Sequence, residues 1–438
     1  MNRLKKLSLT LGFWLLTGLL AGLWIVLPWQ ALLVLPPLVG LWLGISRSGQ
    51  LALAVLRMGL AGLPQRWGAA LVIVIGIAGV TGVLTAMLAM GTGFASTLKR
   101  TGSDSTVILL RGGSQTEINS VITREQAQLA ALLPGIARNA QGRPMVSPEI
   151  TQVIALPSRD GSGDANVQLR GISAAGWEIR PHLRIIAGRS FTPGKQELVV
   201  GQGAARQFAH SAIGDTLRIA GQSWTVVGHF ASDDAHDSEL WADADAMGEL
   251  NRYGIWQAVM LRLVHPEMLA PLRQALAADP RLKLDAETTL HHYGKQSEQL
   301  KTLLDVLGRI IGAIMAVGAA FGALNSMYAV VAGRRQEIGT LRAMGFAPFP
   351  VVAAVMLETL LLALVGGLLG GFIAWSLFNG YSVNTLGRNF SQVVFQFQVT
   401  PGLLLTGLHW AVGIGLIGGL LPALRAARMP ITEALRAG

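Results

Sequence analysis

The sequence predicts an α-helical polytopic membrane protein that carries a mixed α/β domain outside the bilayer. Hydrophobic residues make up 51% of its 438 residues and charged residues only 14%, against about a quarter in an ordinary soluble domain. Apolar runs long enough to cross a bilayer recur along the chain. One long polar stretch, from about Gly91 to Leu300, separates two groups of them.

Six apolar runs are candidate membrane spans, because a helix needs about 20 apolar residues to cross the hydrocarbon core. The first two predict an N-terminal helical hairpin with Pro28-Trp29-Gln30 as its turn. The first run also has the basic start of a secretory signal, but it is long and a second run follows at once, which favours the hairpin. The runs are Leu9–Leu27, Ala31–Ile45, Trp67–Met90, Leu303–Ala332, Val351–Phe378 and Leu403–Leu421.

Lys and Arg in the short connecting segments predict the orientation, since such residues accumulate on the cytoplasmic side. Basic residues mark the N-terminus, the segment after the hairpin, the loop after the fourth span and the C-terminal tail. The hairpin turn has none, and residues 381–400 contain only Arg388. We therefore expect both termini in the cytoplasm and the polar stretch outside.

The polar stretch reads as a mixed α/β domain with short strands separated by turn residues. Helices are expected at Thr123–Leu133, which opens with a Thr123/Gln126 capping box, and at Pro266–Ala278. Ser297–Val306 is expected to extend the fourth span out of the bilayer. The expected strands are Ser105–Leu110, Gln152–Leu156, Ala165–Leu169, Glu197–Val200, Thr216–Ile219 and Ser223–Val227.

Motifs of enzymatic chemistry are absent from the sequence, so we do not expect an enzyme. Neither Gly194-Lys195 nor Gly294-Lys295 has the flanking residues of a nucleotide-binding P-loop, and there is no Cys. The net charge is +10. Many of the positively charged residues flank apolar runs, which favours a membrane surface over nucleic acid as their partner. Two His-containing clusters are interpreted as structural: His291-His292, and a stretch that reads as a solvated loop but could bind a divalent cation, Asp233, Asp234, His236, Asp237 and Glu239.

Polar residues inside the predicted spans are costly and therefore informative. Glu358 lies about two turns into the fifth span, and Asn325 in the fourth span is its expected hydrogen-bond partner. We expect a structural role for this pair; a proton or ligand site is the alternative. His409 is expected near the outer interface of the sixth span.

The most informative segment, residues 334–345, lies between the fourth and fifth spans. Ile338, Leu341 and Met344 recur every three residues and predict one apolar edge on a short helix. Arg334 and Glu337 are spaced to form an ion pair, and Gly345 is placed to end the helix. Such a helix can dock in a groove of another protein.

This segment resembles the coupling region of the MacB/FtsX/LolCE (type VII, mechanotransmission) family of ABC transporter permeases. The matching residues are Glu337-Ile338-Gly339, Leu341-Arg342-Ala343 and Gly345, although Gln336 replaces an Arg of the family pattern. The glycine-rich stretch Leu364–Gly371 and the ending Leu421-Pro422-Ala423 are also similar, as are Ala187-Gly188-Arg189 and Val199-Val200-Gly201 in the polar stretch.

The resemblance covers about residues 50–438, and the N-terminal hairpin is an addition to the family's usual four spans. Together they predict an organisation in four parts. Residues 1–48 would form the N-terminal transmembrane hairpin, and 49–92 an amphipathic cytoplasmic segment with the first core span. Residues 93–300 would form a MacB-like extracytoplasmic core domain. Residues 301–438 would form the FtsX-like permease domain, with three spans and the coupling helix.

The resemblance also implies the function: a permease of the bacterial cytoplasmic (inner) membrane that couples ATP hydrolysis to movement of its extracytoplasmic domain, for export or extraction of a substrate. The ATPase-coupling helix would contain Arg334, Arg335, Glu337, Ile338, Gly339, Leu341, Arg342, Ala343 and Gly345. The implied partners are a separate cytoplasmic ABC ATPase, which uses the ATP and Mg, a second permease copy or paralogue, and a periplasmic adaptor. The alternative is a membrane-anchored sensor or scaffold without an ATPase.

Overall fold

The computed structural model describes residues 24, 27, 30–161, 163–249, 254–386 and 392–430. The chain divides into two compact units. The membrane unit contains residues up to Gly91, Leu303–Gly380 and the chain from Gln398; the outer unit contains Thr92–Thr302 and Tyr381–Phe397. The predicted first span lies mostly outside the described residues.

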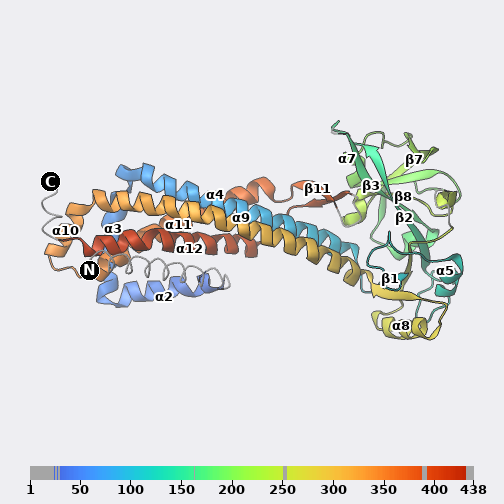
Figure 1. Ribbon diagram of the computed structural model, residues 1–438, viewed down its shortest axis with the longest axis horizontal. Helices are drawn as coiled ribbons and strands as arrows, with labels where there is room; N and C mark the ends of the chain where they lie inside the picture. The colour runs from blue at the N-terminus through green and yellow to red at the C-terminus, as the bar shows by residue number, and fades with distance from the viewer. Residues whose placement is uncertain are drawn as a thin grey trace, which may run out of the picture. The chain divides into compact units, whose positions relative to one another are not determined.

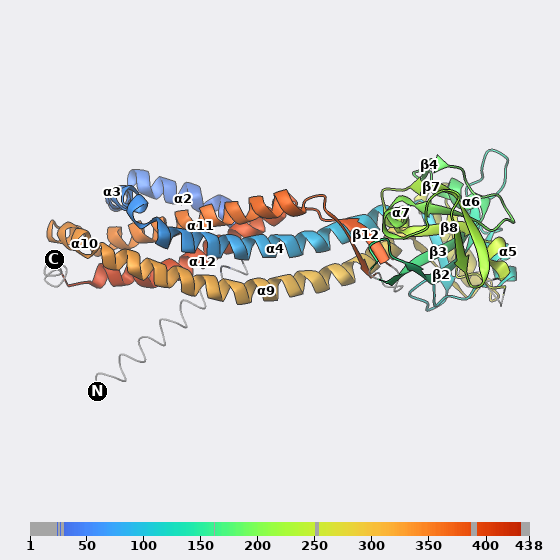
Figure 2. The ribbon, with the colours of Figure 1, turned by 90° about the horizontal axis from the view of Figure 1, so that it is seen from above.

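Long apolar helices form the membrane unit, where α4, α9, α11 and α12 lie side by side (Figures 1 and 2). Four helical segments of the described chain are long and apolar enough to cross a membrane, which confirms four of the six predicted spans. The helices of the chain that contribute to this unit are α2 (Ala31–Ile45), α3 (Arg47–Ala61), α4 (Trp67–Thr101), α9 (Thr289–Gly333), α10 (Arg335–Ala343), α11 (Pro348–Phe378) and α12 (Pro401–Arg428).

The predicted N-terminal hairpin is not confirmed. Its second half, α2, has only 15 residues, which is short for a span by itself. Pro36–Ile45 and α3 together are long and apolar enough to cross a membrane, but a bend of 102° separates the two helices. The helix α3 begins at Ser46, whose side chain accepts a hydrogen bond from Gly49 N.

Glycines on two sides of α11 let its neighbours approach closely. A Cβ at Gly366 would lie 2.8 Å from Val74 O of α4, and a Cβ at Gly370 would collide with Ala78 O of the same helix. A Cβ at Gly367 would lie 2.7 Å from Ala411 Cβ of α12. Small residues at such contacts allow the van der Waals packing that holds helices together in lipid.

A sheet of ten strands forms the frame of the outer unit, with the order β10-β1-β9-β2-β3-β8-β5-β7-β4 and with β6 paired to β7. The strand pairs include both parallel and antiparallel neighbours. The strands are β1 (Thr106–Arg111), β2 (Val146–Pro157), β3 (Asp164–Ile172), β4 (Arg184–Gly188), β5 (Glu197–Gly201), β6 (Thr216–Ile219), β7 (Gln222–Ala231), β8 (Glu239–Asp243), β9 (Ala258–Arg262) and β10 (Leu284–Thr288).

Short helices cover the two ends of this sheet, each over its own apolar core. The helices α5 (Arg124–Ala130) and α8 (Leu269–Ala278) pack with β1, β9 and β10, as Figure 1 shows. The helix α7 (Gln202–Gln207) packs over β2, β3, β5, β7 and β8. The mixed α/β character is therefore as predicted, and the Thr123/Gln126 capping box is present. The other short helices are α6 (Ala174–Ile179), η1 (Leu63–Arg66), η2 (Ala235–Ser238), η3 (Ala246–Glu249) and η4 (Pro266–Met268).

Two strands follow α11 where the sequence predicts only a connection between spans. They are β11 (Ser382–Leu386) and β12 (Gln392–Gln396), which pair antiparallel as a hairpin. This hairpin belongs to the outer unit. Val394 N donates a hydrogen bond of 2.7 Å to Ser238 Oγ of η2.

Candidate functional site

The helix α10 occupies the short connection between α9 and α11, where the sequence places the coupling segment. It begins after Arg334 and ends near Gly345, whose φ of +96° is the left-handed conformation that glycine adopts readily. The Phe346 N–H donates to Leu341 O at 3.1 Å. A helix of about two and a half turns, ended by this glycine turn, thus connects α9 to α11.

The inner face of α10 is used within the chain itself. Ile338 is buried in a cluster with Val351 of α11, and Leu341 is buried against Val55 of α3 and Ala354 of α11. The expectation that Ile338 and Leu341 form an edge for a partner protein is therefore wrong, because α3 and α11 of the same chain already cover them. Met344, the third member of that edge, is 65% exposed.

Arg334 is buried at the corner between α9 and α10, where it joins two carboxylates. Its guanidinium donates to Glu337 Oε2 at 2.8 Å and to Glu358 Oε2 of α11 at 3.1 Å. The predicted Arg334–Glu337 pair is confirmed. The predicted partner of Glu358 is wrong: Asn325 is exposed on α9, and Arg334 takes its place. Gly59 of α3 covers this pair, since a Cβ there would lie 2.7 Å from Glu358 Oε2.

The outer face of α10 is exposed in the described chain. Arg342 is half-buried and donates from Nη1 to the carbonyls of Ala427 and Met429, at the end of α12. Gly339 is buried with the inner face. The exposed residues of α10, of the turn after it and of the start of α11 include Arg335, Gln336, Glu337, Thr340, Ala343, Met344, Gly345 and Phe349; we call these eight the outer face of α10.

A buried network of charged residues lies inside the outer unit. Arg170 of β3 contacts Glu117 at 2.7 Å, Glu149 at 2.9 Å and Glu239 at 2.8 Å, and each side chain is at most 10% exposed. Arg180 contacts Glu149 at 2.8 Å. Three carboxylates thus share two guanidinium groups inside the protein, an arrangement that tolerates the loss of neither Arg.

Tyr293 connects this network to the first turns of α9. Its hydroxyl donates to Glu117 Oε1 at 3.2 Å. Burial opposes ionisation of Glu117, but the charge and hydrogen bonds of Arg170 outweigh it and lower the pKa of Glu117 to about 2. Burial raises the pKa of Tyr293 well above its usual value. The phenol therefore remains a donor and the carboxylate an acceptor throughout the physiological range.

Sequence reasoning missed this network because its members are far apart along the chain. Arg170 and Glu117 are separated by 53 residues and Arg170 and Glu239 by 69. The pairing of β2, β3 and β8 brings Glu149, Arg170 and Glu239 together, and Glu117 reaches Arg170 from the segment after β1. A charged residue at an inward strand position is the sole local signal, and it requires knowing which face of the strand is buried.

The burial of the other polar residues singled out in the sequence differs in part from the expectation. In the stretch 233–239, Asp234, His236 and Glu239 are buried, so its interpretation as a solvated loop is wrong. His292 is buried and its neighbour His291 is exposed, which agrees with a structural role. His409 does not lie at an exposed interface: it is buried and stacked on Trp24 at a centroid distance of 4.7 Å.

Comparison with known proteins identifies two families along the chain. Residues 67–279 match the MacB-like periplasmic core domain, and residues 309–431 match the FtsX-like permease C-terminal domain. The first match begins at the first residue of α4 and covers this helix and most of the outer unit. The second covers α10 with the long helices on either side of it.

Curated relatives extend this similarity. The macrolide export ATP-binding/permease protein MacB of Bdellovibrio bacteriovorus is 24% identical over 402 residues, which cover 83% of this chain and 58% of that protein. The MacB of Photorhabdus laumondii is 26% identical over 319 residues, covering 66% and 46%. The chain thus spans about half the length of these relatives. The periplasmic region of MacB from Actinobacillus actinomycetemcomitans aligns with 46% of this chain and 92% of its own at 14% identity, with a TM-score of 0.34.

Proposed function

Because the chain belongs to the MacB/FtsX family of ABC transporter permeases, we propose that it is a permease subunit driven by an ABC ATPase on a separate polypeptide. ATP and Mg would be used by that partner, since this sequence has no P-loop. Hydrolysis would move the outer unit through α4 and α9 and drive export or extraction of a substrate. In this proposal both termini and α10 are cytoplasmic.

The observation that carries the proposal is the division of α10 into two faces. Its inner face is held by Ile338, Leu341 and the buried Arg334. Its outer face presents apolar Met344 and Phe349, 65% and 59% exposed, beside the charged Arg335. An exposed apolar anchor with a polar rim is typical of a protein interface. We propose that this outer face of α10 docks on the ATPase.

The contacts behind α10 support a role in transmission of movement. Arg334 joins α10 to α11 through Glu358, and Arg342 joins it to the end of α12. The helix α9 runs directly into this corner. A displacement of α10 would therefore act on three long helices at once, whereas a flexible loop would absorb it.

A stripe on α9 supports pairing with a second permease copy. Its members recur with alternating spacings of four and three residues, which is the pattern of a helix–helix seam. All are between 44% and 68% exposed in the single chain: Leu303, Leu307, Ile310, Ile314, Val317 and Phe321. We propose that this α9 stripe packs against the same stripe of the second copy.

The docking proposal is tested with the full chain and the ABC ATPase encoded next to its gene. The two proteins are co-expressed and reconstituted in lipid nanodiscs, and ATP hydrolysis and co-elution are measured. Met344→Asp places a charge in the proposed interface, and we expect association at least tenfold weaker, which corresponds to about 1.4 kcal/mol. ATP hydrolysis of the complex should fall with it.

A matched control separates docking from folding. Leu132→Asp makes the same apolar-to-acidic change at a residue of the outer unit that is 80% exposed, and it should leave association unchanged. Leu341→Asp is unsuitable, because that buried side chain also holds α10 in place. Undiminished co-elution of Met344→Asp would refute docking through this face. Failure of the wild-type chain to bind or stimulate any such ATPase would favour the sensor or scaffold.

A further inference from the structure

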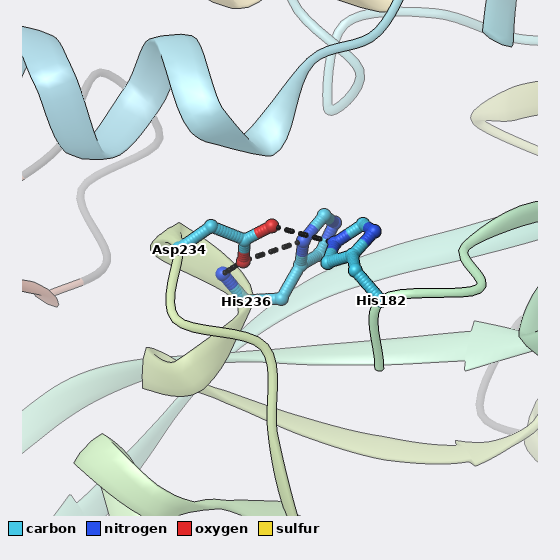
Figure 3. A group of neighbouring side chains, drawn as sticks. All are labelled: His182, Asp234 and His236. Carbon is cyan, nitrogen blue, oxygen red and sulfur yellow. Dashed lines mark hydrogen bonds and ion pairs between the residues drawn. The ribbon is translucent and has the colours of Figure 1, made fainter. Parts of the chain in front are cut away.

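A second cluster of chemically active side chains lies in the outer unit, away from α10 and the buried charge network. Asp234 and His236 belong to the loop after β7 and to η2, and His182 comes from the loop between α6 and β4. Figure 3 shows both imidazole rings turned toward the carboxylate of Asp234. One ligand atom from each residue lies within 4.8 Å of the other two.

The carboxylate of Asp234 lies between the two rings. Asp234 Oδ2 is 3.0 Å from His182 Nε2, and Asp234 Oδ1 is 3.0 Å from His236 Nδ1. Oδ1 also accepts hydrogen bonds from Ser232 Oγ at 2.6 Å and from His236 N at 2.8 Å. The local backbone and Ser232 thus hold the carboxylate in one orientation, and both of its oxygens face histidine nitrogens.

The hydrogen bonds of the cluster leave one buried nitrogen without a partner. The side chain of His236 is 1% exposed, and within the described part of the chain its Nε2 has no hydrogen-bond partner. That Nε2 is on the other side of the ring from Nδ1, so Nδ1 is the nitrogen of His236 that faces the cluster. His182, by contrast, is 43% exposed, so the cluster is open to solvent on one side.

We propose that His182, Asp234 and His236 bind a transition-metal dication of the Zn²⁺ type. Two imidazole nitrogens and one carboxylate oxygen suit Zn²⁺ and similar ions, whereas Mg²⁺ and Ca²⁺ prefer oxygen ligands alone. Zn²⁺ takes such ligands at about 2.0–2.2 Å, so tetrahedral ligand atoms lie roughly 3.3 Å apart. The three ligand atoms lie within 4.8 Å of one another, and each imidazole nitrogen is 3.0 Å from a different oxygen of Asp234. Small side-chain rotations would bring them to that spacing, and the ion would replace the shared protons. Three protein ligands leave a fourth position open on the side of His182.

The location of the cluster suggests what the ion would do. Ala235 N of η2 donates to Thr101 Oγ1, at the end of α4, at 3.1 Å. Ser238 at the other end of η2 accepts the hydrogen bond from β12. Both contacts lie within the outer unit. An ion on Asp234 and His236 would therefore fix the short segment to which the end of α4 and the β11–β12 hairpin are fastened.

The test uses the full chain in detergent, purified without a His tag and treated with EDTA that is then removed. Titration with ZnCl₂ is followed by calorimetry, and bound zinc is counted by elemental analysis. We expect one saturable Zn²⁺ per chain that MgCl₂ does not displace. CoCl₂ in place of zinc should give the visible absorption of a site of low coordination number.

The informative variant is His182→Ala, because that residue is exposed and its loss should leave the fold intact. We expect zinc affinity to fall about 10- to 100-fold, the range seen when the environment of a metal site is damaged. His291→Ala removes another exposed His of the outer unit and should leave affinity unchanged. Hydrogen exchange of residues 232–238 should slow on addition of zinc in the wild type only. Unchanged affinity in His182→Ala, or no saturable binding by the wild type, would overturn the proposal.

Discussion

Replacing Arg170 with Met tests whether the buried charges hold the outer unit together. The substitution keeps a long side chain but removes the guanidinium that Glu117, Glu149 and Glu239 share. Glu149 retains Arg180, while Glu117 and Glu239 lose their ionic partner. Both carboxylates are almost completely buried, so water cannot replace the lost guanidinium.

Two routes give a similar magnitude for the loss. Removing one partner of a buried ion pair typically costs about 3–5 kcal/mol. The difference between the ordinary pKa of 4.5 and the value of about 2 for Glu117 corresponds to about 3 kcal/mol. In a unit of roughly 200 residues each kcal/mol lowers Tm by about 2–4 °C. We therefore expect Arg170→Met to lower the Tm of the outer unit by about 6–20 °C.

The pH dependence provides an independent check. Because the pKa of Glu117 is lowered by folding, its contribution is present above pH 4.5 and is lost as the pH falls toward 2. The gap between wild type and variant should therefore be full at pH 7 and narrow below pH 4.5.

Calorimetry of the full chain measures Tm, and hydrogen exchange of β3 and β8 assigns the change to the outer unit. Arg184→Met is the matched control: its pair with Asp233 joins side chains that are 59% and 64% exposed, and exposed pairs contribute little. A Tm for Arg170→Met within about 2 °C of the wild type, or a gap independent of pH, would refute the reasoning.

Two further predictions concern the membrane unit. Gly59→Ala places a Cβ 2.7 Å from Glu358 Oε2 and 2.8 Å from Arg334 Nη1. Because both groups are buried and paired, we expect the free energy of unfolding to fall by about 1–3 kcal/mol, which calorimetry would show as a lower Tm. Gly68→Ala is the control, because a Cβ there has nothing within 4 Å and should leave Tm unchanged. Ile314→Cys on the α9 stripe introduces the sole thiol of the sequence, and mild oxidation in membranes should give a covalent dimer. Leu368→Cys on α11, a position that is 63% exposed, is the control. Equal cross-linking of the two variants would contradict pairing along α9.

Local patterns explain what could be predicted from the sequence. The apolar runs of α4, α9, α11 and α12 reflect the length of chain needed to cross a bilayer. The capping box of α5 depends on two residues three positions apart. The existence of α10 was evident from its spacing, but its orientation was not, because an apolar edge looks the same whether α11 or another protein covers it.

Long-range pairing explains what was missed. The position of Glu358 inside a span indicates that its carboxylate needs a partner. The sequence places Arg334 in the coupling helix, and only the fold shows that it pairs with Glu358. The contact of His182 with Asp234 spans 52 residues and depends on the connection between α6 and β4. The outer unit also contains β11 and β12, which follow α11 in the chain. The spacing of apolar residues in the sequence does not indicate that the chain returns to this unit after a membrane span.

The glycines of α11 limit how the sequence can drift. Gly366 and Gly370 meet α4, while Gly367 and Gly371 meet α12, so adjacent positions contact opposite neighbours. A Cβ would come within 3.0 Å of the neighbouring helix at the first three positions named, and it would lie 3.2 Å from the Leu404 side chain at Gly371. Leu368, between them, is 63% exposed and can exchange for any residue of similar polarity. Diverged copies of this permease should thus retain small residues at these four positions and vary freely at Leu368, so that α11 keeps its packing against α4 and α12 while its exposed surface evolves.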